Sequence, residues 1–376
     1  MAGPATSFKK VTRLKAPLIP GTKPSLHNNQ LLVSTGVPSF DNTLGGGLAI
    51  GTVLLIEEDV YGSYSKLMLK FYLAEAVLSK HSMLVASADI DPRQLTKELP
   101  GPIVVDPGVE ATISGPGDND MKIAWRYQNM PQVQSSPSGV QFGHYYDMTR
   151  QMSEDLLQAT DITYFHPEVQ DCHCRSSPSG CHGKMRPSYA RLLKAVKSHI
   201  ERGNFSTDAQ SQQRNVLRIG VHSLGSPQWG EEEVGSYDPS LCQFLFALRA
   251  TLRSSYATAI ITMPTHLFQD TAFTKRVEHV CDTVVRLDSF VGSDKEKNPA
   301  FKEYHGLFQV MKLPRLNALT CHELDTYDLA FKLRRKKFTI EKLHLPPELA
   351  DSTGRSQEDD AVAPCSRTTN TNKLDF

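Results

Sequence analysis

Two short apolar runs, Thr52–Ile56 and Met83–Ser87, flank a segment with the periodicity of an amphipathic helix. Within Ser63–Lys80, apolar residues recur every three or four positions from Leu67 to Leu78. Continuous apolar runs of this length are typical of strands that are buried on both faces. A strand, a helix and a strand in this order predict a βαβ unit with parallel strands and a right-handed crossover.

The same alternation returns in the second half of the chain. Amphipathic helices are predicted from Tyr189 onward and over Leu241–Arg253. Apolar strand candidates lie at residues 216–222, 257–263, 283–287 and 306–313. We therefore predict an α/β fold, in which helices cover both faces of a mostly parallel, twisted sheet and the last strands form an antiparallel extension.

Three segments lack this pattern. Residues 1–30 are rich in proline and lysine, residues 350–376 are polar and poor in aromatic side chains, and residues 106–187 are rich in Pro, Gly, Ser and Gln. We predict that both ends are disordered, the first of them basic, and that residues 31–349 form one domain. Residues 106–187 are expected to be a loop-rich insertion with a mixed helix near 148–159.

Charge and cysteine content exclude several classes of protein. Lys and Arg number 41 and Asp and Glu number 41, so any contact with a polyanion must come from local clusters of charge. No apolar run reaches the roughly 18 residues that a membrane-spanning helix needs. The seven irregularly spaced cysteines are expected to be reduced. We expect a soluble intracellular protein.

A glycine-rich segment stands directly before the first strand. It reads STGVPSFDNTLGGGLAIGT over Ser34–Thr52. The three consecutive glycines alone fit an ordinary tight turn equally well. The whole segment, however, resembles the entry to the RecA-like ATPase core, and we expect that core here.

In that core, the strand leads into a phosphate loop of the form G-x-x-x-x-G-K-[ST]. Here Glu57 replaces the first glycine, Gly62 retains the second, Ser63 replaces the lysine and Tyr64 replaces the final Ser or Thr. Lys66 lies about one helical turn beyond the lysine position. The site is therefore degenerate, and its candidate nucleotide-binding residues are Gly62, Ser63 and Lys66.

At two further positions, this chain lacks the catalytic residue types that the resemblance predicts. His222 stands where a strand would end in the Asp that holds Mg²⁺, and imidazole is a poor ligand for that ion. Ser87 or Ala88 stands where the water-activating glutamate would be, and Asp89 and Asp91 follow as ordinary turn residues. We therefore predict no catalytic residues, no cofactor and no bound metal.

The alternative is an active ATPase with a rearranged loop. Lys66 would then contact the phosphates, together with an acidic residue among Glu57, Glu58 and Asp59. A carboxylate beside a triphosphate is repulsive, which argues against this alternative.

The chain is similar to the RecA-like subunits of the eukaryotic Elongator complex over about Leu31 to Leu345. Besides the glycine-rich segment, the resemblance rests on ADIDPRQL, KIAWRYQ, VHSLGSPQWG and ITMPTHLF. It implies a heterohexameric ring with two copies each of three related subunits. This ring would bind tRNA as an accessory to a larger catalytic subcomplex that modifies wobble uridines. The resemblance also implies a location in the cytoplasm and the nucleus.

A cluster of thiols and imidazoles lies within the predicted insertion. Cys172, Cys174, Cys181 and His182 are weak candidates for zinc ligands. Their spacing is shorter than the paired pattern of structural zinc sites, so a reduced loop with incidental thiols is the competing interpretation.

Two groups of basic residues are candidates for contacts with phosphate. Five of the six residues of Lys332–Lys337 are basic, and Arg334, Arg335, Lys336 and Lys337 are candidate tRNA contacts, against the alternative of a solvated surface. Lys312 and Arg315 lie at the end of a late strand, where active RecA-like ring proteins often carry a basic pair that reaches a neighbour's nucleotide. We expect that these two residues could act in trans.

Overall fold

The structure is a computed structural model, and it describes residues 19–25, 30–103, 142–167, 185–209, 214–230, 239–317, 323–334 and 337–344. The helices within these ranges are too short or too polar to cross a membrane.

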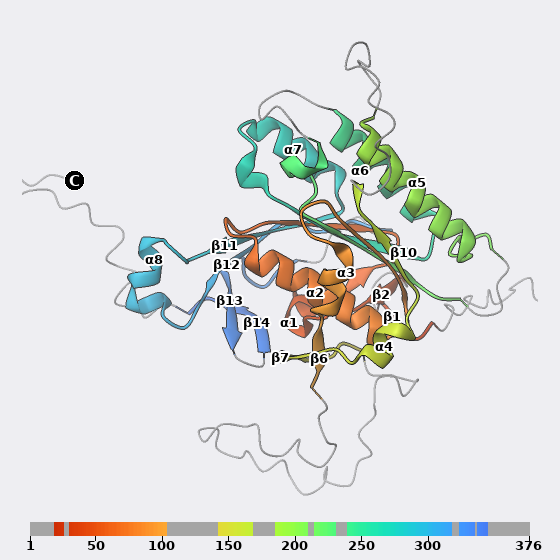
Figure 1. Ribbon diagram of the computed structural model, residues 1–376. Helices are drawn as coiled ribbons and strands as arrows, with labels where there is room; N and C mark the ends of the chain where they lie inside the picture. The colour runs from red at the N-terminus through yellow and green to blue at the C-terminus, as the bar shows by residue number, and fades with distance from the viewer. Residues whose placement is uncertain are drawn as a thin grey trace, which may run out of the picture.

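A nine-stranded sheet forms the centre of the fold, with the strand order β14-β13-β12-β11-β4-β10-β9-β5-β8 (Figure 1). The six strands from β11 to β8 are parallel, and β12, β13 and β14 continue the sheet in antiparallel pairing. The strands are β4 (Val53–Glu57), β5 (Ser82–Ser87), β8 (Ile162–Phe165), β9 (Leu217–His222), β10 (Ala257–Met263), β11 (Thr283–Ser289), β12 (Gly306–Lys312), β13 (Leu329–Arg334) and β14 (Lys337–Lys342). The predicted α/β class and the antiparallel extension are confirmed.

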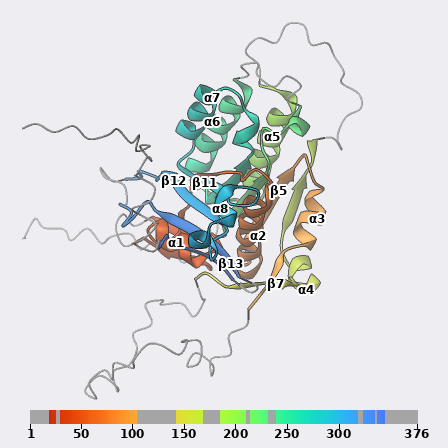
Figure 2. The ribbon, with the colours of Figure 1, turned by 90° about the vertical axis from the view of Figure 1, so that its left-hand side faces the viewer.

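Helices cover both faces of this sheet, as predicted. Helix α2 (Ser63–Leu78) lies on one face, and α5 (Pro187–Arg202), α6 (Ser240–Arg253) and α7 (Thr271–Val280) lie on the other (Figures 1 and 2). Successive residues of a strand point to opposite faces. In β4, Leu54 and Ile56 accordingly join the apolar core beneath α2, while Val53 and Leu55 join the core beneath α5 and α6.

Part of the N-terminal segment that we predicted to be disordered is ordered. Strand β1 (Thr22–Pro24) pairs with β2 (Leu31–Val33), which pairs with β3 (Leu48–Ala49). Ile19 packs into the core beneath α2. The prediction is therefore wrong for residues 19–25, because three residues that pair with a neighbouring strand need no hydrophobic periodicity of their own.

The predicted insertion contains more regular structure than expected. In place of a mixed helix near 148–159, the chain forms strand β7 (Tyr146–Gln151) and the short helix α4 (Glu154–Gln158). β7 pairs with β6 (Pro100–Pro102), and β8 joins the edge of the main sheet beside β5. The mixed-helix prediction is borne out only over α4 and is wrong for residues 148–151, which belong to the short, partly exposed strand β7.

Three short helices complete the described fold. They are α1 (Pro38–Thr43), α3 (Pro92–Lys97) and α8 (Asp294–Lys297). The tail from residue 350, residues 1–18 and the KIAWRYQ segment lie outside the described residues.

Candidate functional site

The glycine-rich segment that suggested the fold is held together by a buried carboxylate and packs closely against α2. The buried carboxylate of Asp41 accepts hydrogen bonds from the hydroxyl groups of Ser34 (2.5 Å) and Thr35 (2.7 Å) and from the Thr35 backbone N–H (2.7 Å). Burial raises the pKa of Asp41 to about 6. Gly36 has a φ of 83°, and a Cβ there would lie 2.3 Å from the Phe71 carbonyl oxygen of α2, so only glycine permits this close approach.

The degenerate phosphate loop joins β4 to α2, and an acidic side chain occupies the start of the helix. The Asp59 carboxylate accepts the backbone N–H groups of Ser63, Tyr64 and Ser65, each at 3.1 Å. Gly62, directly before the helix, has a φ of 61°. The free N–H groups at a helix N-terminus are the groups that bind phosphate in a phosphate loop. Here the chain's own carboxylate takes them.

Glu57, in the position of the first motif glycine, is buried at the end of β4. Arg286 lies beside it in the register of the neighbouring strand β11 and donates through Nε to Glu57 Oε2 at 2.6 Å. Burial raises the pKa of Glu57, and the Arg286 guanidinium opposes that shift. This pair fixes β4 to β11 at the edge where a nucleotide would lie.

A cavity of about 490 Å³ opens at the same edge, lined by the loops that follow β4, β5, β9 and β10. Of the predicted nucleotide residues, Gly62 and Lys66 line it, whereas Ser63 contributes its backbone N–H to Asp59. Glu58 also lines the cavity and accepts the Ser223 hydroxyl at 3.4 Å. Burial raises the pKa of Glu58 to about 7, and the nearby carboxylates of Asp89 and Asp59 add to the shift.

His222 lies on this cavity, as its position at the end of β9 predicted. Its Nδ1 lies 3.3 Å from Ser87 Oγ, and burial lowers its pKa to about 4, so the imidazole is neutral near pH 7. Asp89 accepts the Ser226 hydroxyl at 2.5 Å. The positions of the Mg²⁺ ligand and the general base are therefore adjacent, but they hold an imidazole and a hydroxyl group. A neutral imidazole and a serine are not the hard carboxylate donors that Mg²⁺ prefers.

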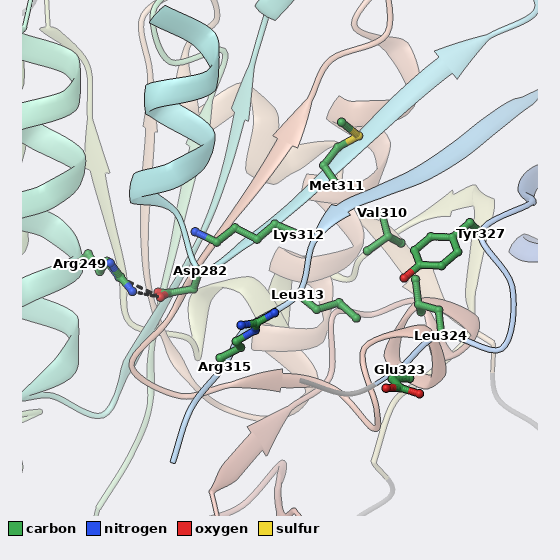
Figure 3. Close-up of a pocket in the computed structure, with 10 residues that line it drawn as sticks. All are labelled: Arg249, Asp282, Val310, Met311, Lys312, Leu313, Arg315, Glu323, Leu324 and Tyr327. Atoms are coloured by element: carbon green, nitrogen blue, oxygen red, sulfur yellow. Dashed lines mark hydrogen bonds and ion pairs between the residues drawn. The ribbon is translucent and has the colours of Figure 1, made fainter. Parts of the chain in front are cut away.

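The predicted trans-acting residues lie at the opposite edge of the sheet, beside a second cavity of about 470 Å³ (Figure 3). Lys312 Nζ donates to the backbone carbonyls of Cys281 (2.6 Å), His279 (2.8 Å) and Glu278 (3.4 Å), which follow or end α7. Its three donors are thus satisfied within the chain. Arg315 is exposed on the wall of the cavity.

A buried carboxylate organises that second cavity. Asp282 accepts Arg249 Nε at 2.8 Å, an Arg253 guanidinium nitrogen at 2.6 Å and the backbone N–H of Val53 at 3.0 Å. Figure 3 shows Arg249 and Asp282 joined at one end of the cavity, with Glu323 and Tyr327 toward the other. Through Asp282, Arg249 and Arg253 thus hold α6 to the starts of β4 and β11.

The basic run at residues 332–337 is divided between the end of β13 and the start of β14. Lys332 is buried and pairs with Glu303 (3.0 Å) and Glu341 (3.1 Å). Arg334 and Lys337 are exposed, and Lys337 Nζ lies 4.5 Å from the centre of the Tyr145 ring. Arg335 and Lys336 lie outside the described residues.

The candidate zinc ligands Cys172, Cys174, Cys181 and His182 also lie outside the described residues. Within the ranges that the structure describes, no three His, Cys, Asp or Glu side chains are grouped closely enough to hold a metal ion.

Sequence reasoning missed the roles of Asp59, Asp282 and Arg218. Asp59 lies three residues before Gly62, the N-cap residue of α2, so it is outside the position where a capping side chain is expected. Arg218 lies in the middle of β9, fully buried, and donates to His81 Nδ1 at 3.0 Å and to the Ser34 carbonyl at 2.7 Å. No local pattern marks its partners, because they come from segments far away in the sequence.

Comparison with known proteins identifies relatives along almost the whole chain. The family model of the PAXNEB protein matches residues 15–376. Elongator complex protein 4 from Danio rerio is 46% identical over 384 aligned residues, which cover 99% of this chain and 96% of the relative. The proteins of the same name from Xenopus laevis and Homo sapiens are each 45% identical. They cover 95% and 97% of this chain and 90% and 88% of their own lengths.

Proposed function

The chain belongs to the PAXNEB family, whose relatives here are named Elongator complex protein 4, and from this premise we propose that it is a non-catalytic RecA-like subunit of the Elongator accessory ring. Two copies of this chain and two copies each of two other RecA-like subunits would form the ring. The ring would dock tRNA for modification of the wobble uridine by the larger catalytic subcomplex, in the cytoplasm and the nucleus.

The contact between Asp59 and the start of α2 carries the non-catalytic part of this proposal. A phosphate group and the Asp59 carboxylate would compete for the same N–H groups, and the carboxylate is covalently attached and therefore always present. Two anions at one helix N-terminus would also repel each other. The neutral His222 at the Mg²⁺ position supports the same interpretation.

One observation favours the alternative, an ATPase with a divergent phosphate loop. Lys66 and Glu58 line the same cavity, so a cation and an acidic group are both present there. ATP turnover by the isolated chain, and by the assembled ring with and without Lys66→Ala, separates the two functions. We expect no turnover by the isolated chain and unchanged turnover by the variant ring. A Lys66-dependent loss of turnover would support the alternative.

The exposed side chains of Arg334 and Lys337 support a contact with the tRNA backbone. Contacts between basic side chains and tRNA phosphates should give an affinity whose logarithm falls linearly with the logarithm of the salt concentration. We expect this behaviour for the ring and little binding by the isolated chain. Equal affinities of the chain and the ring would contradict a composite site.

Arg315 is a better candidate than Lys312 for a contact with a neighbouring subunit. Its side chain is exposed, whereas Lys312 would have to give up three backbone carbonyls to reach another chain. Arg315→Ala should therefore alter assembly or nucleotide response of the ring more than the stability of the isolated chain. Lys312→Ala should do the reverse.

A further inference from the structure

Exposed apolar side chains surround the cavity at the carboxyl edge of the parallel strands. Val60 and Tyr61, in the loop after β4, are 68% and 63% exposed. Leu267, after β10, and Val291, after β11, are also exposed, and a Cβ on Gly292 would lie 3.2 Å from the Tyr61 hydroxyl, which places the Val291 loop beside Tyr61. Large apolar side chains gathered on one edge are typical of a surface that contacts another protein.

An incompletely bonded carboxyl group lies inside this apolar rim. Glu58 is only 9% exposed, and its Oε1 has no hydrogen-bond partner within the described chain. Its other oxygen accepts the Ser223 hydroxyl at 3.4 Å, and a hydrogen bond from Thr262 also lowers the pKa of this carboxyl group. A buried polar group without a full set of partners is costly, so a donor supplied from outside would stabilise the site.

The charges around the cavity favour a cationic occupant. Asp89 lines the cavity with Glu58, and Asp59 lies at the start of α2 beside it. Among the described lining residues, Lys66 is the one Lys or Arg. His222 is neutral. An anion would find the helix N-terminus already occupied by Asp59, whereas a cation would meet an acidic group with one oxygen that has no hydrogen-bond partner in the described chain.

We propose that this cavity receives a lysine or arginine side chain from the neighbouring subunit of the ring, which donates to Glu58 while Val60, Tyr61 and Leu267 pack around it. The inference rests on the proposed function for the existence of the ring, and it names the chemistry of the contact at this edge. A charged pair enclosed by apolar contacts has the arrangement of an interface hot spot. A basic side chain would thereby take the place that a nucleotide occupies in an active relative of this fold.

The test compares Glu58→Gln with Glu201→Gln in the full chain. Glu58→Gln keeps the shape of the side chain and removes its charge, while Glu201→Gln removes the same charge from the exposed surface of α5. Binding of each protein to the purified pair of other ring subunits is measured by titration calorimetry at pH 7. We expect Glu58→Gln to weaken binding at least about 30-fold, because it breaks a desolvated charged pair. Glu201→Gln should stay within about twofold of the unsubstituted chain.

Proton release gives a second readout that a merely structural role would not change. A cation that contacts Glu58 holds it ionised, so association at pH 7 should release up to about half a proton from a group that is half protonated in the free chain. Calorimetry in buffers of different ionisation enthalpy measures this number. The Glu58→Gln protein should lack this contribution.

Each outcome separates the inference from the proposed function. If the unsubstituted chain binds the other two subunits and Glu58→Gln binds equally well with the same proton release, the basic side chain is not there, and ring membership stands. If the unsubstituted chain does not bind them at all, ring membership fails and the inference falls with it. A melting temperature of isolated Glu58→Gln at or above that of the unsubstituted chain would exclude misfolding as the cause of weak binding.

Discussion

The carboxylate of Asp59 lies 3.1 Å from the backbone nitrogen of Tyr64 and accepts its N–H in the first turn of α2. Tyr64 stands at the position where an active phosphate loop has its Ser or Thr. The same oxygen also accepts Ser65 N–H, and the second oxygen accepts Ser63 N–H. A side chain that acts as a helix cap here therefore fills the position of a phosphate group.

This contact should contribute to the stability of the fold. Asp59→Ala would leave three N–H groups of α2 without their acceptor, and the expected loss in unfolding free energy is about 1–2 kcal/mol. Asp59→Asn retains one acceptor oxygen and should lose less. Urea denaturation of the isolated chain measures both values. An Asp59→Ala protein as stable as the unsubstituted chain would show that the cap is energetically irrelevant.

Replacing Arg218 should be among the most damaging single changes. Its guanidinium group is fully buried, bonds His81 and the Ser34 carbonyl, and lies 4.9 Å from the centre of the Tyr72 ring. Arg218→Met would leave these acceptors unpaired in the core, and we expect a loss of about 3–5 kcal/mol by urea denaturation. Arg202→Met, at an exposed position of α5, is the matched control and should be nearly neutral. Similar midpoints for the two variants would contradict this account of the buried network.

Asp282 and the two arginines that it binds, Arg249 and Arg253, should contribute unequally to the free energy of unfolding. Asp282→Asn removes the charge that holds two arginines, and the expected cost in unfolding free energy is about 3 kcal/mol. Arg249→Gln leaves Arg253 in place at a partly exposed pair, so its expected cost is about 1 kcal/mol or less. Denaturation curves of the two variants provide the comparison. Equal costs would mean that the two arginines do not share the carboxylate.

The stability of the isolated chain should depend on pH in a specific way because of Glu58. Burial raises its pKa from 4.5 to about 7, so the folded chain holds this proton more tightly than the unfolded chain does. Its contribution to the unfolding free energy is therefore present below pH 4.5 and is lost as the pH rises toward 7. The stability of Glu58→Gln relative to the unsubstituted chain should rise over this window by up to about 3 kcal/mol and then level off.

Taking the difference between the two proteins at each pH removes the other titrating groups. Asp41, with its raised pKa, contributes with the same sign as Glu58, whereas His81 and His222, with lowered pKa values of about 3 and about 4, contribute with the opposite sign. The pH profile of either protein alone is therefore a sum of opposing effects. Parallel profiles for the two proteins from pH 5 to 8 would contradict a raised pKa at Glu58.

The central sheet was predictable because buried parallel strands are continuous apolar runs. β4, β5 and β10 have this character, whereas the apolar runs of β9 and β11 are interrupted by Arg218 and Arg286; each strand was predicted within one or two residues. β8 was missed because its four residues are partly exposed at the sheet edge and carry no such signal. β7 was taken for part of a helix for the same reason.

The position of the candidate site was predictable, but its bonding was not. Motif spacing placed Gly62, Lys66 and His222 near one another, since the carboxyl ends of parallel strands meet at one edge. The return of Asp59 onto α2 depends on the loop conformation, and the pairing of Lys312 with α7 depends on the packing of β12. Neither of these is encoded in a local pattern of residue types.

Titration of MgATP into the isolated full-length chain at pH 7 most directly tests whether Asp59 has taken the place of the phosphate. With the α2 amides occupied by Asp59 and neutral His222 at the metal position, we predict no saturable binding up to millimolar nucleotide. Saturable binding of one MgATP per chain, lost in Lys66→Ala, would contradict the account.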